Sequence, residues 1–232
     1  MRRYRAVFLD AQGTLIRPYP STVDLYREAF RSSGTQVDPA QIGQAVSELW
    51  TEHRRATAGQ SRFDTSDEAT RRWWDEFNTR LFRRLIRNGN PAPFVAASWE
   101  IFGRPERWRT FQEVEQVVEE LRRRGYRLGV VSNWDSRLLP ICESLGLARR
   151  MDFLLASALA GVEKPDPRIF HLALATVGVS PEEAIHVGDD YEADILGARA
   201  AGIEALLLDR DGQHEGKPGR IGCLTELLEK LP

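Results

Sequence analysis

Residues Arg5 to Ile16 read RAVFLDAQGTLI, and the fold of the chain is organised around this stretch. Ala6 to Leu9 form a short apolar run with a β-branched residue, a pattern that predicts a strand buried on both faces. Asp10 follows the run directly, which places a carboxylate at the carboxyl end of the strand, where open α/β sheets bind their ligands. Gly13 allows a tight turn after it. Asp10 is either an ordinary turn residue or part of a site, and the rest of the chain decides between the two.

The composition is typical of a soluble globular protein. The chain has 232 residues, of which 42% are hydrophobic and 28% charged, with a formal net charge of −2. This balance argues against a nucleic-acid partner held by bulk electrostatics. No apolar run approaches the length of a membrane span or a signal-peptide core, so we expect a cytoplasmic protein with no membrane partner. Cys142 and Cys223 are too few for a disulfide framework and are expected to be reduced, buried thiols.

The residues after this first stretch have the periodicity of helices, which predicts a small helical bundle between Arg17 and Trp108. Asp38 and Pro39 have the pattern of an N-cap followed by a first-turn proline. Thr65 and Glu68 fit a capping box. The predicted helices cover residues 21–33, 38–57, 65–87 and 94–102.

Five tryptophans lie in or at the end of this helical part, at positions 50, 73, 74, 99 and 108. Large aromatic residues at helical spacing usually serve packing. We therefore expect most of them to lie in the core of the bundle rather than in a pocket.

From Phe111 onward strands and helices alternate, which predicts right-handed crossovers and a parallel sheet covered by helices on both faces. The expected strands are 127–132, 153–156, 184–188 and 204–208, and the expected helices 113–124, 137–145, 167–176, 192–201 and 224–231. The fold class is α/β, with a Rossmann-like core of residues 1–16 and 109–232 and an inserted helical cap of residues 17–108. The absence of a glycine-rich fingerprint after the first strand argues against a nicotinamide or flavin cofactor.

Polar side chains follow several of the predicted strands. Asp10 follows the first, Ser132 and Asn133 end the second, and Asp189 and Asp190 follow the strand at 184–188. Asp194 comes one helical turn later, and Lys164 lies in the loop VEKPDP. Each of these could be a turn, cap or surface residue. Parallel strands deliver their carboxyl ends to one edge, however, so we expect the groups to converge in one crevice.

Such a crevice would hold the carboxylates of Asp10, Asp189 and Asp194 close together. Like charges at short range repel, so a hard cation with oxygen ligands, most simply Mg²⁺, is the expected occupant. Lys164 would add a second positive charge, and the Ser132 hydroxyl would add a hydrogen-bond donor. Positive centres and donors around one nucleophilic carboxylate predict a site for a phosphoryl group.

The order and spacing of these motifs resemble the haloacid dehalogenase (HAD) superfamily, subfamily I, with a helical C1-type cap. FLDAQGTL resembles the first motif of that family, VVSNWD the second, EKPDPRIF the third and HVGDDYEADILGA the fourth. The resemblance implies that Asp10 is the nucleophile and a Mg²⁺ ligand, and that Asp189 binds the metal with support from Asp194. It also implies that Ser132 and the amide of Asn133 bind phosphate, that Lys164 steadies nucleophile and phosphate, and that the backbone carbonyl of Gln12 is a further metal ligand.

Gln12 departs from the family pattern, because family phosphatases have a second aspartate at this position as general acid and base. An amide can hydrogen-bond to a leaving oxygen but cannot exchange a proton near neutral pH. General acid–base assistance contributes typically about 10²–10⁴-fold to a rate. The sequence therefore predicts a Mg²⁺-dependent phosphatase for a small phosphorylated metabolite, with weak activity or activity selective for good leaving groups such as acyl and aryl phosphates.

Three alternatives remain at this point. The first is a 2-haloacid dehalogenase, because enzymes of that kind also lack the second aspartate. The resemblance is less close, however, since those enzymes need no metal and have a serine at the position of Asp189. A phosphonatase would need a lysine in the cap, whereas the three lysines of the chain are Lys164, Lys217 and Lys230. The third alternative is a catalytically silent protein of the same fold that binds phosphometabolites or other proteins. The oligomeric state is open.

Overall fold

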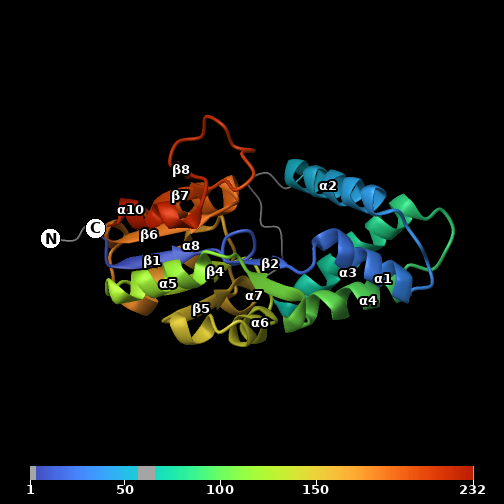
Figure 1. Ribbon diagram of the computed structural model, residues 1–232, viewed down its shortest axis with the longest axis horizontal. Coiled ribbons are helices and arrows are strands. Elements are labelled where there is room, and N and C mark those ends of the chain that lie inside the picture. Colours follow the sequence, from blue (N-terminus) through green and yellow to red (C-terminus); the bar gives the residue numbers. More distant parts are fainter. Residues whose placement is uncertain (1–3, 57–65, 232) are drawn as a thin grey trace.

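A six-stranded sheet lies at the centre of the larger part of the molecule (Figure 1). The computed structural model describes residues 4–56 and 66–231. Every neighbouring pair of strands in this sheet is parallel, in the order β5-β4-β1-β6-β7-β8. The strands are β1 (Ala6–Leu9), β4 (Arg127–Ser132), β5 (Phe153–Ala156), β6 (Ala184–Gly188), β7 (Glu204–Leu208) and β8 (Arg220–Ile221). The predicted parallel α/β fold is confirmed.

The strand β1 lies in the middle of the sheet, and all four of its residues are fully buried. Leu9, its last residue, pairs with Val130 of β4 on one side and Val187 of β6 on the other. The three strands are therefore in register where they end. The residues that follow them emerge together at the carboxyl edge of the sheet.

Helices cover both faces of the sheet, as the alternating side chains of β1 require. Val7 and Leu9 pack in one hydrophobic cluster with residues of α5 (Val114–Arg123), α6 (Leu138–Ser144) and α10 (Leu227–Lys230). Ala6 and Phe8 pack in a second cluster with α8 (Pro167–Val177) and α9 (Gly197–Ala200). These layers hold β1, and with it the start of the site, rigidly in place.

Four helices form a separate layer at one end of the molecule, to the right of the sheet in Figure 1. They are α1 (Thr22–Ser32), α2 (Pro39–Ala56), α3 (Asp67–Leu85) and α4 (Ala92–Gly103). A third hydrophobic cluster joins them, with Phe30 and Phe94 stacked at 4.0 Å at its centre. As predicted, the Asp38 carboxylate caps α2 by accepting a hydrogen bond of 2.8 Å from the Ala40 amide.

The chain enters and leaves the four-helix layer through a two-stranded antiparallel ribbon. Its strands are β2 (Ile16–Pro18) and β3 (Trp108–Thr110), and Arg17 pairs with Arg109. The two connections between the helices and the sheet are thus hydrogen-bonded to each other. Whether residues 17–108 form a cap domain with these boundaries stays a prediction.

Some local predictions differ from the structure. Thr65, expected in a capping box, lies outside the described residues, and Ser66 caps α3 by accepting from the Ala69 amide. The continuous α-helix expected over residues 192–201 is wrong, because a π-helical segment, η4 (Tyr191–Leu196), precedes α9. The structure also has the short helices α7 (Ser157–Ala160), η1 (Pro105–Arg107), η2 (Ala148–Arg150), η3 (Pro181–Glu183) and η5 (Leu224–Glu226). Among the helices of the described residues, none combines the length and apolar character needed to cross a bilayer.

Candidate active site

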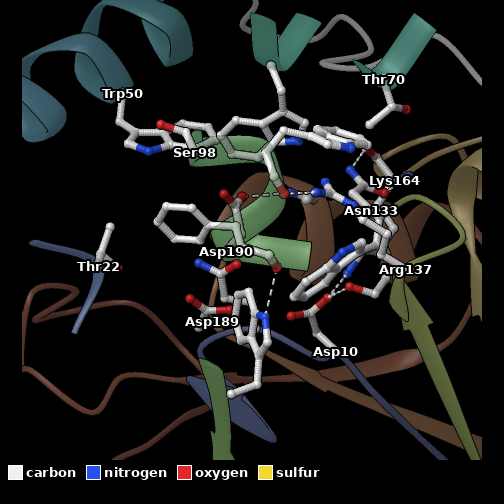
Figure 2. Close-up of a pocket in the computed structure, with 18 of the residues that line it drawn as sticks. Asp10, Thr22, Trp50, Thr70, Ser98, Asn133, Arg137, Lys164, Asp189 and Asp190 are labelled. Carbon is white, nitrogen blue, oxygen red and sulfur yellow. Dashed lines mark hydrogen bonds and ion pairs between the residues drawn. The ribbon is translucent and has the colours of Figure 1, made fainter. Parts of the chain in front are cut away.

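A cavity of about 320 Å³ lies between the carboxyl edge of the sheet and the four-helix layer. Asp10 and Asp189 lie on its sheet side, while Trp50, Thr70 and Ser98 lie opposite them (Figure 2). The predicted convergence is therefore observed: the cavity-lining residues include Asp10, Gln12, Ser132, Asn133, Lys164, Asp189, Asp190 and Asp194. Segments far apart in the sequence meet here because the parallel strands end together.

Three carboxylates form a cluster on the sheet side of the cavity. Asp10, Asp189 and Asp194 each place one oxygen within 4.8 Å of the other two. Asp10 and Asp194 are almost fully buried, with exposed fractions of 6% and 1%, and Asp189 is less buried. Such crowding of negative charge in a buried place is unfavourable unless positive charge balances it.

Glycines make the room for this cluster. A Cβ on Gly13, which has φ +83°, would come within 2.2 Å of Oδ2 of Asp189. A Cβ on Gly188 would come within 2.0 Å of Cγ of Asp194. A larger residue at either position would force the carboxylate opposite it to shift, so the two glycines leave the space in which the carboxylates meet.

Lys164 supplies positive charge to the cluster. Its Nζ donates to Oδ1 of Asp10 and to Oδ1 of Asp194, each at 2.6 Å, and the side chain is 2% exposed. Burial alone would lower the pKa of Lys164, but the charges of Asp10 and Asp194 raise it above its ordinary value. The side chain is therefore a fixed ammonium ion that bridges two of the three carboxylates.

The two oxygens of Asp10 have different surroundings. Oδ1 accepts hydrogen bonds from Nζ of Lys164 and from the Ser132 hydroxyl, the latter at 3.0 Å. Oδ2 accepts no hydrogen bond from any residue of the described ranges 4–56 and 66–231. Burial raises the pKa of Asp10, while the Lys164 charge opposes this rise. The carboxylate is thus oriented through one oxygen and leaves the other open.

Asp194 is held from three directions. Besides Lys164, Nε2 of His186 lies 2.8 Å from its Oδ1, and the Asp190 amide donates to its Oδ2 at 3.0 Å. Burial alone would raise the pKa of Asp194, but Lys164 and His186 hold it below its ordinary value. His186 was not among the predicted site residues. The one signal for it was a histidine inside the apolar run Ala184–Gly188.

Asp189 differs from the other two carboxylates because no described residue donates a hydrogen bond to it. Burial, together with the charge of Asp10, raises the pKa of Asp189 well above its ordinary value. An acceptor that lacks donors, beside the carboxylates of Asp10 and Asp194, completes an all-oxygen donor set of the kind that binds Mg²⁺. The residues present therefore fit a divalent cation.

Asn133 and Asp190 have structural roles at the edge of the site. The Asn133 side chain accepts from the Lys164 amide and donates to the Lys164 carbonyl, both at 2.8 Å, and so fixes the lysine loop. Asp190 caps η4 by accepting from the amides of Glu192 and Ala193. The capping interpretation of Asp190, considered from the sequence, is confirmed.

Gln12 lines the cavity two residues after Asp10, and its side chain is exposed. Within the part of the chain that the structure describes, no residue forms a hydrogen bond with its side-chain amide. The amide is therefore free to turn toward a group bound in the cavity. The proposed contribution of its backbone carbonyl to a metal site stays a prediction.

The prediction about the five tryptophans of the helical part is confirmed only in part. Trp50, Trp73 and Trp74 pack against the hydrophobic cluster of the helices, but most of the five also line the cavity. Trp50, Trp74, Trp99 and Trp108 all line the cavity, and of the five only Trp73 does not. Helical spacing was correctly recognised, but it cannot distinguish a face that packs on another helix from a face that lines a cavity. Trp134, on the sheet side, joins them at 4.9 Å from Trp108.

Comparison with known proteins agrees with this arrangement. A family model described as haloacid dehalogenase-like hydrolase matches residues 4–202. The chain belongs to this family. Among its HAD relatives, the bovine "Haloacid dehalogenase-like hydrolase domain-containing protein 3" is 34% identical over 209 residues, which cover 88% of this chain and 81% of the relative. The phosphoserine phosphatase of Thermus thermophilus is 31% identical over 245 residues, 97% of this chain and 98% of that protein.

Solved structures show the same HAD fold. The HAD-hydrolase YfnB of Bacillus subtilis, crystallised with magnesium, has a TM-score of 0.78 at 19% identity, with 99% of each chain covered. A crystal structure of a dehalogenase has a TM-score of 0.73 at 21% identity and covers 98% of this chain and 97% of that one. At these identities the likeness concerns the fold alone. The chain is a HAD-like hydrolase, and its reaction has to be argued from its own site.

Proposed function

We propose that the protein is a Mg²⁺-dependent phosphatase that acts on a small phosphorylated metabolite through an aspartyl-phosphate at Asp10. The observation that carries this proposal is the asymmetry of Asp10. Oδ1 is held by Lys164 and Ser132, whereas Oδ2 accepts no hydrogen bond from the described residues. A buried carboxylate with one anchored and one open oxygen is prepared to act as a nucleophile.

The cation site follows from the acidic cluster. Asp10, Asp189 and Asp194, with the backbone carbonyl of Gln12, would hold Mg²⁺ at the sheet edge. When bound, the ion supplies the positive charge that balances the carboxylates and stabilises negative charge on a phosphoryl group. Two relatives named as phosphatases support this reading: the phosphoserine phosphatase is 31% identical over 245 residues, and a ribulose-1,5-bisphosphate 5-phosphatase is 35% identical over 153 residues.

The chain's own residues can carry both chemical steps. In the first, Oδ2 of Asp10 attacks phosphorus, the bond to the leaving oxygen breaks, and its electron pair stays on that oxygen. Lys164 and the Ser132 hydroxyl remain beside the anionic phosphoryl group as a cation and a donor. In the second step, water attacks phosphorus, the bond to Asp10 breaks and the carboxylate is restored, while the proton of water passes to solvent.

Gln12 determines which substrates can react. Its amide can donate a hydrogen bond to the leaving oxygen but cannot give it a proton. Alkyl phosphates, which leave as strongly basic alkoxides, should react slowly for this reason. Acyl and aryl phosphates leave as stable anions and should react faster.

The four-helix layer is proposed to be a cap over this site. In this interpretation residues 1–16 and 109–232 form the catalytic core, and residues 17–108 form the cap. The paired strands β2 and β3 would be the joint between them. The position of the cavity, with the sheet edge on one side and Trp50 and Thr70 on the other, supports this division (Figure 2).

A dehalogenase reading is disfavoured by Asp189. The carboxylate of a 2-haloacid would enter a site that already holds three acidic side chains, and like charges at this range repel. A silent binding protein would have no use for the open Asp10 oxygen. The geometry therefore favours the phosphatase.

The test is a phosphate-release screen over a panel of phosphorylated metabolites with acetyl phosphate and p-nitrophenyl phosphate. Wild type, Asp10→Asn and Gln12→Asp are each assayed with and without Mg²⁺. We expect release by wild type with Mg²⁺ only, and none by Asp10→Asn. Silence of both wild type and Gln12→Asp on every compound would refute the proposal, and halide release from 2-chloropropionate without metal would favour the dehalogenase.

A further inference from the structure

We propose that the cavity above Asp10 selects phosphoryl compounds whose leaving group is planar, aromatic and uncharged. This inference rests on the proposed phosphatase function and names the class of substrate. Three features of the described residues support it. The lining contains many aromatic rings, its two cations are already paired with carboxylates, and the Asn78 side chain has no hydrogen-bond partner among the described residues.

The lining above the acidic cluster is rich in aromatic rings. Helices α1 to α4 contribute Tyr26, Trp50, Trp74 and Trp99, and Trp108 and Trp134 lie toward the sheet. These rings are fixed by contacts with one another: Trp50 and Trp74 lie at 6.0 Å and 76°, and Trp108 and Trp134 at 4.9 Å and 64°. Rigid aromatic walls offer offset and edge-to-face contacts to a flat ring.

The cations of the described lining residues are Lys164 and Arg137, and both are already paired. Lys164 bridges Asp10 and Asp194 at the sheet edge. The Arg137 guanidinium donates to both oxygens of buried Asp135, at 2.8 and 2.7 Å, and to the Trp99 carbonyl at 3.1 Å. The Cζ atom of Arg137 also lies over the Trp99 ring, 3.3 Å from the ring centre. A second anionic group on a substrate would therefore find no uncompensated cation among these residues.

Asn78 adds a polar group to this apolar part of the cavity. The residue is 3% exposed, lines the cavity and makes no hydrogen bond with any described residue, and its Oδ1 is completely buried. A buried amide without partners is costly. Because Oδ1 is inaccessible, the Asn78 amide would meet a ligand through Nδ2, as a donor to a neutral acceptor such as the oxygen of a ring hydroxyl.

Two independent features favour the same class of substrate, the aryl phosphates. The lining favours an aromatic ring, and Gln12 favours a leaving group that needs no proton, a property of phenols compared with alcohols. The cavity volume of about 320 Å³ lies near the lower end of the range for ligand pockets, which suits one or two rings. Phosphoserine, the substrate in the name of one relative, differs in both respects, because its leaving group is a charged alcohol.

The experiment compares aryl phosphates whose leaving phenols have similar acidity, so that the effect of Gln12 is nearly constant. Phenyl phosphate, 2-naphthyl phosphate and 4-carboxyphenyl phosphate are assayed with Mg²⁺, and phosphoserine and acetyl phosphate accompany them. We expect kcat/KM for 2-naphthyl phosphate to exceed that for 4-carboxyphenyl phosphate by about tenfold or more, since pocket contacts of this size discriminate by about 10–200-fold. Phosphoserine should be the poorest of the five.

Two neighbouring tryptophans provide a matched pair of variants. Trp74 lines the cavity, whereas Trp73, the next residue of α3, is not a lining residue and contacts the lining rings Trp74 at 4.7 Å and Trp50 at 5.7 Å. We expect Trp74→Leu to reduce the ratio of kcat/KM for 2-naphthyl over phenyl phosphate by about fivefold, in the range for the loss of one aromatic contact. Trp73→Leu should reduce this ratio less, because it removes support from Trp50 and Trp74 but no ring that lines the cavity. Each ratio compares two substrates on the same preparation. A loss of active enzyme through partial misfolding lowers both rates equally and leaves the ratio unchanged.

Binding is measured separately with Asp10→Asn, which cannot turn over, by quenching of tryptophan fluorescence. 2-Naphthyl phosphate should bind more tightly than 4-carboxyphenyl phosphate and phosphoserine. Turnover with phosphoserine or 4-carboxyphenyl phosphate at least equal to that with phenyl phosphate would overturn the inference but leave the phosphatase intact. No phosphate release from any compound, acetyl phosphate included, would refute the phosphatase. The binding order alone would then decide the inference: it stands if the naphthyl compound binds best and falls if it does not.

Discussion

The Nζ atom of Lys164 lies 2.6 Å from Oδ1 of Asp10, and both side chains are almost completely buried. The lysine holds the oxygen that the proposed reaction does not use, and no described residue donates a hydrogen bond to Oδ2. The same ammonium reaches Asp194, so one charge orients the nucleophile and limits repulsion within the cluster. Lys164 therefore contributes both to the orientation of the nucleophile and to the charge balance of the site.

Lys164→Met should reduce both activity and stability. Removing one partner of a buried ion pair typically costs about 3–5 kcal/mol, because the remaining charges stay buried without compensation. Thermal denaturation and phosphate release are the measurements, and Lys230→Met, at an exposed position, is the control. Turnover at the wild-type rate in Lys164→Met would contradict the assigned role.

Asp189→Asn should stabilise the protein without metal and abolish its response to Mg²⁺. The raised pKa of Asp189 means that its ionised form opposes folding at pH values above that pKa. This destabilisation is lost as the pH falls through the folded-state pKa, so the difference between variant and wild type should shrink toward acid pH. The measurement is the melting temperature with EDTA and with Mg²⁺ at several pH values.

Asp190→Asn is the matched control for this prediction, because Asp190 is the neighbouring carboxylate and asparagine is an equally good helix cap. It should keep the response to Mg²⁺. If Asp189→Asn gains as much stability from Mg²⁺ as wild type, the proposed cation site is wrong.

Gly188→Ala should disrupt the cluster, because the new Cβ would lie 2.0 Å from Cγ of Asp194, whose buried carboxylate would have to shift away from Lys164, His186 and the Asp190 amide. We expect a large loss of Mg²⁺-dependent activity and a lower melting temperature. Gly43→Ala, in helix α2, introduces a methyl group at an ordinary contact distance of 3.5 Å and should raise stability by about 0.5–1 kcal/mol. Equal effects of the two substitutions would argue against a close-packed cluster.

The convergence of the site residues could be predicted from the sequence because it follows from strand direction alone. Asp10, Ser132 and Asp189 each follow an apolar run with strand character, and parallel pairing brings such ends together. Local signals also predicted the Asp38 cap. These features depend on short stretches of chain or on a rule that holds for all parallel sheets.

The features that sequence reasoning missed depend on how distant elements dock. The tryptophans of α2 to α4 have the same spacing whether they face a core or a cavity, and only the position of the sheet edge opposite them decides which. The pairing of Arg137 with Asp135 could not be predicted from the sequence either. Opposite charges two residues apart are common on protein surfaces, and the sequence does not show that this pair is largely buried beside a cavity. The π-helical turn of η4 places Asp194 against Lys164 and His186, a tertiary contact that overrides the local preference for an α-helix.

Gln12→Asp should accelerate the hydrolysis of alkyl phosphates by as much as about 10²–10⁴-fold, the usual contribution of a general acid and base. The gain on acetyl phosphate should be smaller, because its leaving group needs no proton. Gln12→Asn, which changes the length but not the chemistry of the side chain, is the control. A variant that gains equally on all substrates, or gains nothing on alkyl phosphates, would show that Gln12 does not limit proton transfer.

The most direct test of the account concerns covalent phosphate on Asp10. Because Gln12 cannot act as a base for water, the second step should be slow, and the intermediate should accumulate. Wild type is mixed with p-nitrophenyl phosphate and Mg²⁺, quenched in acid within the first turnover, and digested for mass spectrometry. We predict a phosphoryl group on Asp10 in the peptide from wild type, a matching burst of p-nitrophenol, and neither in Asp10→Asn. Steady release of phosphate by Asp10→Asn, at a rate near that of wild type, would contradict the account.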